Sequence, residues 1–242
     1  MKLEICHLYP DVLNLYGDQG NIICLQKRLA WRGIESAVTE LPIGARDDLT
    51  RFDLFFIGGG QDFEQGVLLS DLATGKAADI RAAVADGKVF LAVCGGYQML
   101  GQYYLTREGG QMDFIGAVDL YTVGAETRMI GDMMFDTGQA VGGVVVGFEN
   151  HSGRTYLGQG VSPLGLVLSG HGNNGEDGTE GCRSQNVFGT YAHGPVLPKN
   201  PKFADHILSA ALSLRYPGVT LAELDDSLEN AAHAYMAARL AK

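Results

Sequence analysis

The chain has 242 residues, of which 46% are hydrophobic and 19% charged, and its formal net charge is −10 at pH 7. This length supports a large core without disulfides or metals. The acidic balance argues against binding to a nucleic-acid backbone, which needs clustered lysines and arginines. The four cysteines are scattered, and no signal-peptide pattern or long apolar run is present. We expect one globular domain over residues 1–242 in a cytoplasmic protein.

The first hundred residues alternate between strand and helix patterns. The predicted strands are residues 3–8, 36–41, 52–60 and 88–93, and the predicted helices are residues 21–31, 71–86 and 97–103. Gly33 and Gly87 follow two of these helices, where a left-handed residue commonly ends a helix. Alternating elements with fully apolar strands are typical of a parallel α/β sheet covered on both faces.

The pattern changes after Gly101. Residues 116–196 are rich in glycine and strand-like, and residues 140–151 and 163–172 predict strands of a more antiparallel region. The chain returns to helix at residues 201–215 and 220–240. The last helix carries an apolar stripe that predicts packing against the core rather than an interface; it consists of Leu221, Leu224, Leu228, Ala231 and Tyr235.

One cysteine lies at the junction of a predicted strand and helix, in "VFLAVCGGYQMLG", residues 89–101. A tight turn there exposes the side chain of Cys94, and Gly95 and Gly96 permit the close approach that such a nucleophile elbow needs. The start of the following helix favours a thiolate. The alternative is a buried structural cysteine. The flanking glycines favour the nucleophile.

A thiol nucleophile needs a base, and a histidine at another strand end would supply it. The segment "NVFGTYAHGP" is an apolar strand that carries His193 into a Gly-Pro turn, which sets His193 apart from the other histidines, the alternative being an ordinary turn histidine. The other candidates lie in the terminal helices, at the end of the first strand or in the glycine-rich region: His206, His233, His7, His151 and His171.

Three consecutive glycines follow the buried strand in "FIGGGQDF", residues 56–63. Their free backbone N–H groups are suited to stabilising an oxyanion. A tight strand-to-helix connection is the structural alternative. A phosphate-binding loop is disfavoured, because no lysine follows and the GxGxxG spacing is absent.

The segments "AVCGGYQMLG", "FIGGGQD" and "VFGTYAHGP" together resemble the class I (triad) glutamine amidotransferases, in the branch found in cobyric acid and cobyrinic acid a,c-diamide synthases. Four further segments are similar to the GatD subfamily, the glutaminase subunits of lipid II isoglutaminyl synthases: "LYPDVLNLYGDQGNI", "GAETRMIGD", "GFENHSGRTYLG" and "GTYAHGPVLPKNP". The resemblance implies a flavodoxin-like, partly mixed sheet flanked by helices.

The resemblance also implies catalytic roles. Cys94 would attack the carboxamide carbon of glutamine, and His193 would take the thiol proton and return it to the leaving ammonia. The backbone N–H groups near Gly59, Gly60 and Gly95 would hold the oxyanion.

Two further residues are implied to bind the substrate. Gln98 lies one turn after the nucleophile and matches the glutamine-pocket residue of the elbow motif. Arg128, in "AETRMIGD", would clamp the α-carboxylate of glutamine with its guanidinium fork, the alternative being an ordinary surface arginine.

The chain departs from the common triad pattern, in which a glutamate lies two residues after the histidine. Here His193 is followed by Gly194 and Pro195. The carboxylate that orients the imidazole must come from elsewhere, or the Cys-His pair works alone. Asp18 in "YGDQGN", Glu149 in "GFENH" and a carboxylate from a partner subunit are the three options.

A partner is implied because ammonia is useful only beside an activated carboxylate, and no nucleotide-binding motif is present. The resemblance implies a heterodimer with a Mur-ligase-like (MurT-type) synthetase that holds ATP and Mg and amidates D-glutamate of lipid II to D-isoglutamine. This peptidoglycan synthesis would take place at the inner face of the bacterial membrane, without insertion. We expect no cofactor or metal in this chain. The alternatives are a glutaminase for cobyrinate-type amidation, a cysteine hydrolase, or a silent binding module.

Overall fold

A six-stranded sheet forms the centre of the protein. The computed structural model describes residues 1–60 and 62–241, and for residues 62–66 only their backbone. The strand order is β11-β12-β4-β3-β1-β2. The four pairings among β12, β4, β3, β1 and β2 are parallel, and β11 is antiparallel to β12. The strands are Lys2–Leu8 (β1), Glu35–Leu41 (β2), Leu54–Ile57 (β3), Val89–Val93 (β4), Cys182–Ser184 (β11) and Val187–Thr190 (β12). The predicted parallel α/β sheet is confirmed.

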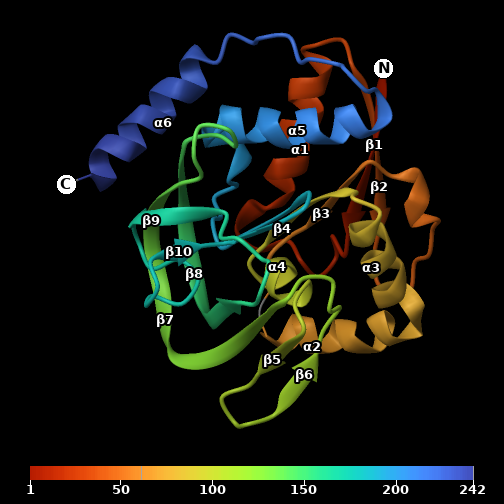
Figure 1. Ribbon diagram of the computed structural model, residues 1–242, viewed down its shortest axis with the longest axis vertical. Coiled ribbons are helices and arrows are strands. Elements are labelled where there is room, and N and C mark those ends of the chain that lie inside the picture. Colours follow the sequence, from red (N-terminus) through yellow and green to blue (C-terminus); the bar gives the residue numbers. More distant parts are fainter. Residues whose placement is uncertain (61, 242) are drawn as a thin grey trace.

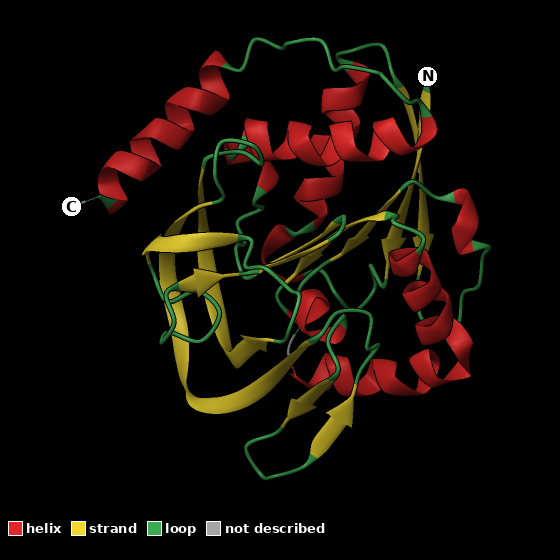
Figure 2. Ribbon diagram, viewed as in Figure 1, coloured by secondary structure: helices red, strands yellow, loops and turns green. Residues whose placement is uncertain are grey.

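Helices cover both faces of this sheet (Figures 1 and 2). On one side lie α1 (Gln19–Ala30) and α5 (Pro201–Arg215), which contact each other. On the other side lie α2 (Asp62–Asp71) and α3 (Ala77–Ala85). Every residue of β3, β4 and β12 is therefore buried, which explains why these strands read as continuous apolar runs.

A second sheet occupies the glycine-rich part of the chain, in the order β10-β9-β7-β5-β6, with β8 paired to β7. The long strands β7 (Leu120–Asp136) and β8 (Val144–Leu157) run antiparallel, as predicted for this region. Their register shifts between Gly124 and Met129, so residues 125–128 leave the ladder. The shorter strands are Tyr103–Leu105 (β5), Gln111–Asp113 (β6), Gly165–Ser169 (β9) and Thr179–Glu180 (β10).

Two helix predictions in the first half need correction. The helix expected over residues 71–86 is the end of a longer unit, in which α2 continues into a π-helical turn, Leu72–Lys76, and then α3. Gly75 has a φ of +112° and interrupts the regular helix, which a residue with a Cβ atom would resist. Gly87, with a φ of +76°, follows the end of α3 as predicted.

The helix expected over residues 97–103 is shorter and begins earlier, as α4 (Gly95–Met99). The chain then turns toward the second sheet, where the Gln102 N–H donates to the Leu120 carbonyl at 2.8 Å. A Cβ atom on Gly101 would lie 2.3 Å from Leu120 Cδ1. This close tertiary contact ends the helix, and the local apolar pattern gives no sign of it.

The C-terminal helix α6 (Ser227–Leu240) starts seven residues later than the predicted boundary at 220 and has no buried residue. Its Leu228 and Tyr235 are 78% and 70% exposed, so the expectation that the stripe packs into the core is wrong for α6 and is confirmed only for Leu221, which precedes the helix. The preceding segment is non-helical and is held to the turn after α1 instead, because Arg32 Nε donates to the Ala222 carbonyl at 2.6 Å. Within the part of the chain that the structure describes, no helix has the length and apolarity needed to cross a bilayer.

A buried arginine joins three helical segments. Arg28 on α1 has a side chain only 2% exposed and donates to Asp205 on α5 and to Asp226 just before α6, at 2.7 Å in both cases. Losing one member of a buried ion pair leaves an uncompensated charge, which is strongly destabilising.

We therefore expect Arg28→Met to lower the free energy of unfolding by about 3 kcal/mol. The matched control is Arg107→Met, because the Arg107–Glu126 pair is 52% and 86% exposed and such pairs contribute less than about 1 kcal/mol. Urea unfolding measures both changes. Equal effects of the two substitutions would contradict a structural role of the Arg28 pair.

Candidate active site

Cys94 lies at the turn between β4 and α4, as predicted. Its φ of 47° and ψ of −108° are unusual for a residue with a side chain, and such conformations cost about 1–3 kcal/mol unless the surroundings impose them. The Cys94 N–H donates to the Thr190 carbonyl at 2.8 Å, and the Cys94 carbonyl accepts from Gln98 at 2.9 Å. Gly96 is required beside it, because a Cβ atom there would lie 2.5 Å from Ile57 Cγ2.

His193 follows β12, the strand next to β4, and its side chain is fully buried. Its backbone forms an antiparallel bridge to Phe148 of β8. Burial disfavours the charged imidazolium, but the hydrogen bond to Asp18 and the nearby sulfur of Cys94 outweigh this effect and raise the pKa of His193 to about 10. The structure thus brings the two predicted catalytic side chains together.

Asp18 is the carboxylate that the structure places at this histidine. It lies between β1 and α1, is fully buried, and its Oδ1 is 3.2 Å from His193 Nδ1. Its Oδ2 accepts the Gly59 N–H at 2.7 Å. Glu149, the other candidate within the chain, instead accepts hydrogen bonds from His171 and Gly172. Of the two, only Asp18 is in contact with the imidazole of His193.

The triple glycine brings the backbone against the same side chains. A Cβ atom on Gly59 would lie 2.6 Å from His193 Cε1 and 3.4 Å from Cys94 Cβ. The prediction for Gly59 as an oxyanion donor needs correction in this structure, because its N–H donates to Asp18. Gly60 is buried at the end of this loop and Gly95 opens α4 directly after the thiol. Their oxyanion role stays a prediction.

The other histidines have different surroundings. His7 is buried in β1, and burial lowers its pKa to about 4, partly opposed by Asp18. His206 and His233 lie on α5 and α6. His151 and His171 both face Glu149.

Tyr16 belongs to the site, although the sequence analysis did not select it. Its backbone is left-handed, with a φ of 55°. Its ring meets the imidazole of His193 edge-on, with centroids 4.9 Å apart, and is 44% exposed. The segment "NLYGD", with a glycine and an acid directly after the tyrosine, was the available signal.

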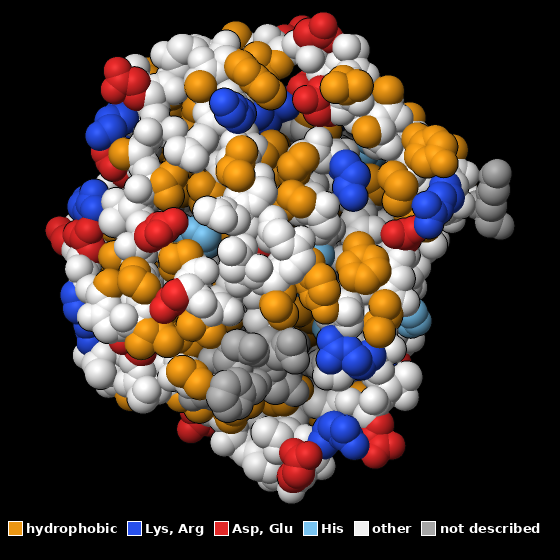
Figure 3. Space-filling model, turned by 180° about the vertical axis from the view of Figure 1, so that it is seen from behind, with side chains coloured by type: hydrophobic (Ala, Val, Ile, Leu, Met, Phe, Trp, Pro, Cys, Tyr) orange, Lys and Arg blue, Asp and Glu red, His pale blue; other side chains and the backbone are white. Residues whose placement is uncertain are grey.

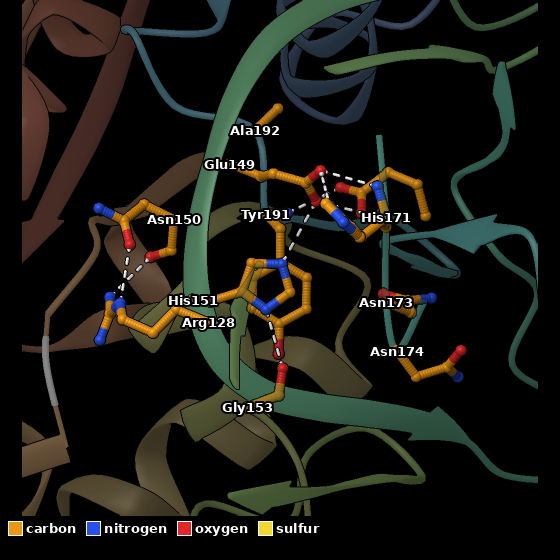
Figure 4. A network of polar contacts seen from close by, with 12 residues as sticks. Arg128, Glu149, Asn150, His151, Gly153, His171, Asn173, Asn174, Tyr191 and Ala192 are labelled. Carbon is orange, nitrogen blue, oxygen red and sulfur yellow. Dashed lines mark hydrogen bonds and ion pairs between the residues drawn. The ribbon is translucent and has the colours of Figure 1, made fainter. Parts of the chain in front are cut away.

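Arg128 is exposed, in the irregular part of β7, and is linked to the site through Asn150. Its Nε donates to Asn150 Oδ1 at 2.9 Å and its Nη2 to the Asn150 carbonyl at 3.2 Å (Figure 4). Asn150 Nδ2 in turn donates to the Tyr16 hydroxyl at 2.6 Å. The guanidinium is therefore connected to His193 through Asn150 and Tyr16, at the rim of the site.

Gln98 is buried one turn after Cys94, and its Nε2 donates to the Tyr191 hydroxyl at 2.9 Å. The structure thus groups Cys94, His193 and Asp18, with Gln98 behind the thiol and Arg128 at the rim. In residues 1–60 and 62–241 no cluster of three histidine, cysteine or acidic side chains is suited to hold a metal. The face in Figure 3 mixes acidic, basic and hydrophobic side chains and shows no continuous basic patch.

A buried imidazole beside a strained cysteine, at the carboxyl ends of adjacent parallel strands, is an arrangement suited to acyl transfer by a thiol. Residues 4–201 match the CobB/CobQ-like glutamine amidotransferase domain. The chain belongs to this family.

Two curated relatives are similar to this amidotransferase over most of their length. The GatD subunit of the glutamine-hydrolysing lipid II isoglutaminyl synthase of Staphylococcus aureus is 40% identical, over 94% of this chain and 92% of the relative. The corresponding subunit of Streptococcus pneumoniae is 39% identical, over 89% of this chain and 82% of the relative. A cobyric acid synthase from Pelotomaculum thermopropionicum is 32% identical over 80% of this chain, but only 37% of that longer protein is covered.

Solved structures agree on the fold. A chain in the structure of PurLQS from Thermotoga maritima matches with a TM-score of 0.58 at 19% identity, over 86% of this chain and 99% of that chain. A glutamine amidotransferase from the same organism matches with a TM-score of 0.56 at 12% identity, over 99% and 95%. The flavodoxin-like, partly mixed sheet expected from the sequence is the class I amidotransferase fold.

The contact between Asp18 and His193 predicts a pH effect. Replacing Asp18 with asparagine removes the charge that favours the imidazolium, so the pKa of His193 should fall from about 10 by at least about one pH unit. NMR titration of the imidazole measures this change. Asp132→Asn, at an ion pair with Arg239 on the surface, is the control and should leave this pKa unchanged.

Because the pKa of His193 in the folded chain lies above the ordinary value of 6.5, its contribution to stability is fully present below about pH 6.5 and is lost as the pH rises through about 10. The Asp18→Asn variant should therefore lose less stability than the wild type across this range. An unchanged pKa in Asp18→Asn would contradict the assigned contact.

Proposed function

We propose that this chain is the glutaminase subunit of a lipid II isoglutaminyl synthase. It hydrolyses L-glutamine to glutamate and delivers ammonia to a ligase subunit for peptidoglycan synthesis. The observation that carries the proposal is the Cys94–His193–Asp18 arrangement in a chain that is 40% identical to a GatD subunit over 94% of its length.

The reaction begins at the thiol of Cys94. Asp18 accepts from Nδ1 of His193, which leaves Nε2 as the ring nitrogen for the cysteine. Because the pKa of His193 is raised to about 10, the imidazole takes the thiol proton before the sulfur attacks the carboxamide carbon of glutamine and a tetrahedral intermediate forms. When the C–N bond breaks, the imidazolium returns the proton to nitrogen, and ammonia and a glutamyl thioester result.

The second half of the reaction regenerates the thiol of Cys94. Water attacks the thioester, His193 accepts one of its protons, and the C–S bond breaks to give glutamate and the cysteine. Backbone N–H groups of Gly60 and Gly95 are the proposed donors to the oxyanion in both halves. The Gly59 N–H instead fixes Asp18, through the 2.7 Å hydrogen bond.

Substrate recognition is assigned to Arg128 and Gln98. Arg128 would pair with the α-carboxylate of glutamine, and this new pair would replace its hydrogen bonds to Asn150. Tyr16 lies against His193 and is bonded to the same Asn150, so movement of Arg128 and Asn150 would also free the tyrosine. Gln98, behind the thiol, is to contact the glutamine side chain.

The partner is proposed to be a Mur-ligase-like, MurT-type synthetase in a heterodimer with this chain. Ammonia must meet a carboxylate activated by ATP, and we propose that the partner holds ATP and Mg and binds lipid II at the inner face of the membrane. Its product would be D-isoglutamine in the stem peptide. The similarity to GatD subunits over nearly the whole chain supports this assignment.

The first test measures ammonia release from L-glutamine, with and without the ligase partner. We expect Cys94→Ser and His193→Ala each to reduce the rate by a factor of about 1,000 or more, since the two side chains act as a unit. Asp18→Asn should reduce it by about 100-fold or more, because the imidazole loses its orientation. The isolated wild-type chain should release ammonia, since Asp18 supplies a carboxylate within the chain.

The matched control is Cys24→Ser, which removes a thiol on α1 away from the turn that carries Cys94. It should retain the wild-type rate, and normal turnover by Cys94→Ser would overturn the assignment of the nucleophile. Offering lipid II or cobyrinate to the complete complex with ATP distinguishes the proposed substrate from that of the cobyric acid synthases. Amidation of cobyrinate alone would replace the proposal.

A further inference from the structure

One face of β8 lies behind the proposed glutamine pocket. Because side chains alternate along a strand, Glu149, His151, Gly153 and Thr155 share one face, and all four residues are buried, whereas residues 148, 150, 152 and 154 are only partly buried. None of these residues has been assigned a contact with glutamine. The contacts described below nevertheless lead from this face to the side chain of Gln98.

Glu149 starts the sequence of contacts. Its carboxylate is fully buried and accepts the backbone N–H groups of His171 at 2.7 Å and Gly172 at 3.1 Å. Although burial alone would raise the pKa of Glu149, the neighbouring imidazole of His151 and the hydrogen bonds from His171 lower it. The charged carboxylate lies 3.5 Å from Nε2 of His151 (Figure 4).

His151 makes a hydrogen bond through one ring nitrogen and faces Glu149 with the other. Its Nδ1 donates to the Gly153 carbonyl at 2.8 Å, and its Nε2 faces Glu149. The imidazole lies flat against the ring of Tyr191, with centroids 3.5 Å apart and an interplanar angle of 7° (Figure 4). The position of the tyrosine ring is therefore tied to that of the histidine.

Tyr191 is fixed at its other end by a second buried acid, since its N–H donates to Glu180 at 2.7 Å. Its hydroxyl accepts from Gln98 Nε2 at 2.9 Å and lies 2.6 Å from Thr155 Oγ1. Gly153 closes the space on another side of the amide, because a Cβ atom there would lie 2.4 Å from Gln98 Nε2. The amide is confined by a hydrogen bond and by a backbone contact.

We propose that Glu149, His151 and Tyr191 are positioning residues that orient the Gln98 amide for glutamine binding, with Gly153 limiting its movement. This inference rests on the proposed function. None of the three touches the substrate. Glu149 fixes the imidazole, the imidazole fixes the tyrosine ring, and the tyrosine hydroxyl fixes the amide.

The experiment measures KM and kcat for L-glutamine in the complex with the ligase partner. Tyr191→Phe keeps the ring but removes the hydroxyl that holds the Gln98 amide. It should raise KM about tenfold with kcat within about threefold, as expected if the freed amide loses one hydrogen bond to glutamine. Glu149→Gln keeps the shape of the side chain without its charge and should raise KM about threefold.

A Gln98→Met background separates positioning from a structural effect. Methionine has a similar shape but no amide, so Tyr191→Phe should raise KM no further in this background. The matched control is Tyr97→Phe, which removes the hydroxyl of a neighbouring buried tyrosine that is bonded to Asn173 rather than to Gln98. The control should leave KM unchanged.

A tenfold rise in both backgrounds, or an equal rise in Tyr97→Phe, would overturn the proposal and indicate a structural role. If Tyr191→Phe does not fold, Gly153→Ala provides the test, because its methyl group would lie 2.4 Å from Gln98 Nε2 and 2.7 Å from Thr122 Cγ2. It should raise KM, whereas the control Gly110→Ala on the β5–β6 hairpin should not, and an equal rise in both would overturn the proposal.

Glutamine binding to Cys94→Ala, measured by calorimetry, distinguishes the two proposals. Binding that Tyr191→Phe does not weaken overturns the positioning role alone. The proposed function and the positioning role both fail if neither glutamine binding nor ammonia release is found.

Discussion

The backbone turn at Cys94 is the constraint on which the site depends. A residue with a side chain adopts φ 47° and ψ −108° only where its neighbours enforce it. Here β4 lies between β3 and β12, and Thr190 at the end of β12 accepts the Cys94 N–H. The turn directs the thiol out of the sheet, at the edge where the loops after β1, β3 and β12 meet.

That shared edge explains how distant segments form one site. Asp18 follows β1, Gly59 follows β3 and His193 follows β12, and all of these strands run parallel to β4. Gly58 and Gly59 allow the loop after β3 to pass close to its neighbours. A Cβ atom on Gly58 would lie 2.2 Å from the Leu13 carbonyl oxygen, and one on Gly59 would lie 2.6 Å from His193 Cε1. The glycines are therefore required for packing around Asp18 and His193.

The second sheet supplies the surroundings of Cys94, His193 and Asp18. Phe148 of β8 pairs with the backbone of His193, and Asn150 links Arg128 to Tyr16. On the opposite face of the same strand, Glu149 and His151 lie behind Tyr191. One strand thus borders both the rim and the interior of the proposed glutamine pocket, because its side chains alternate between two environments.

The sequence alone determined the parallel sheet and the Cys94 turn and made His193 the candidate base, because apolar strands that end in glycines or a Gly-Pro turn are local patterns. It left Asp18, Glu149 and a carboxylate from a partner subunit as open alternatives, placed the last helix against the core and overlooked Tyr16, Asn150 and Tyr191. Only the tertiary structure decided these points. The contact between Asp18 and His193 joins residues 175 positions apart, and the exposed stripe of α6 follows from the anchoring of residues 222 and 226 to α1 and to the turn after it. The periodicity of a sequence indicates which side chains share a face of a helix or strand, whereas contacts between distant residues decide what that face packs against.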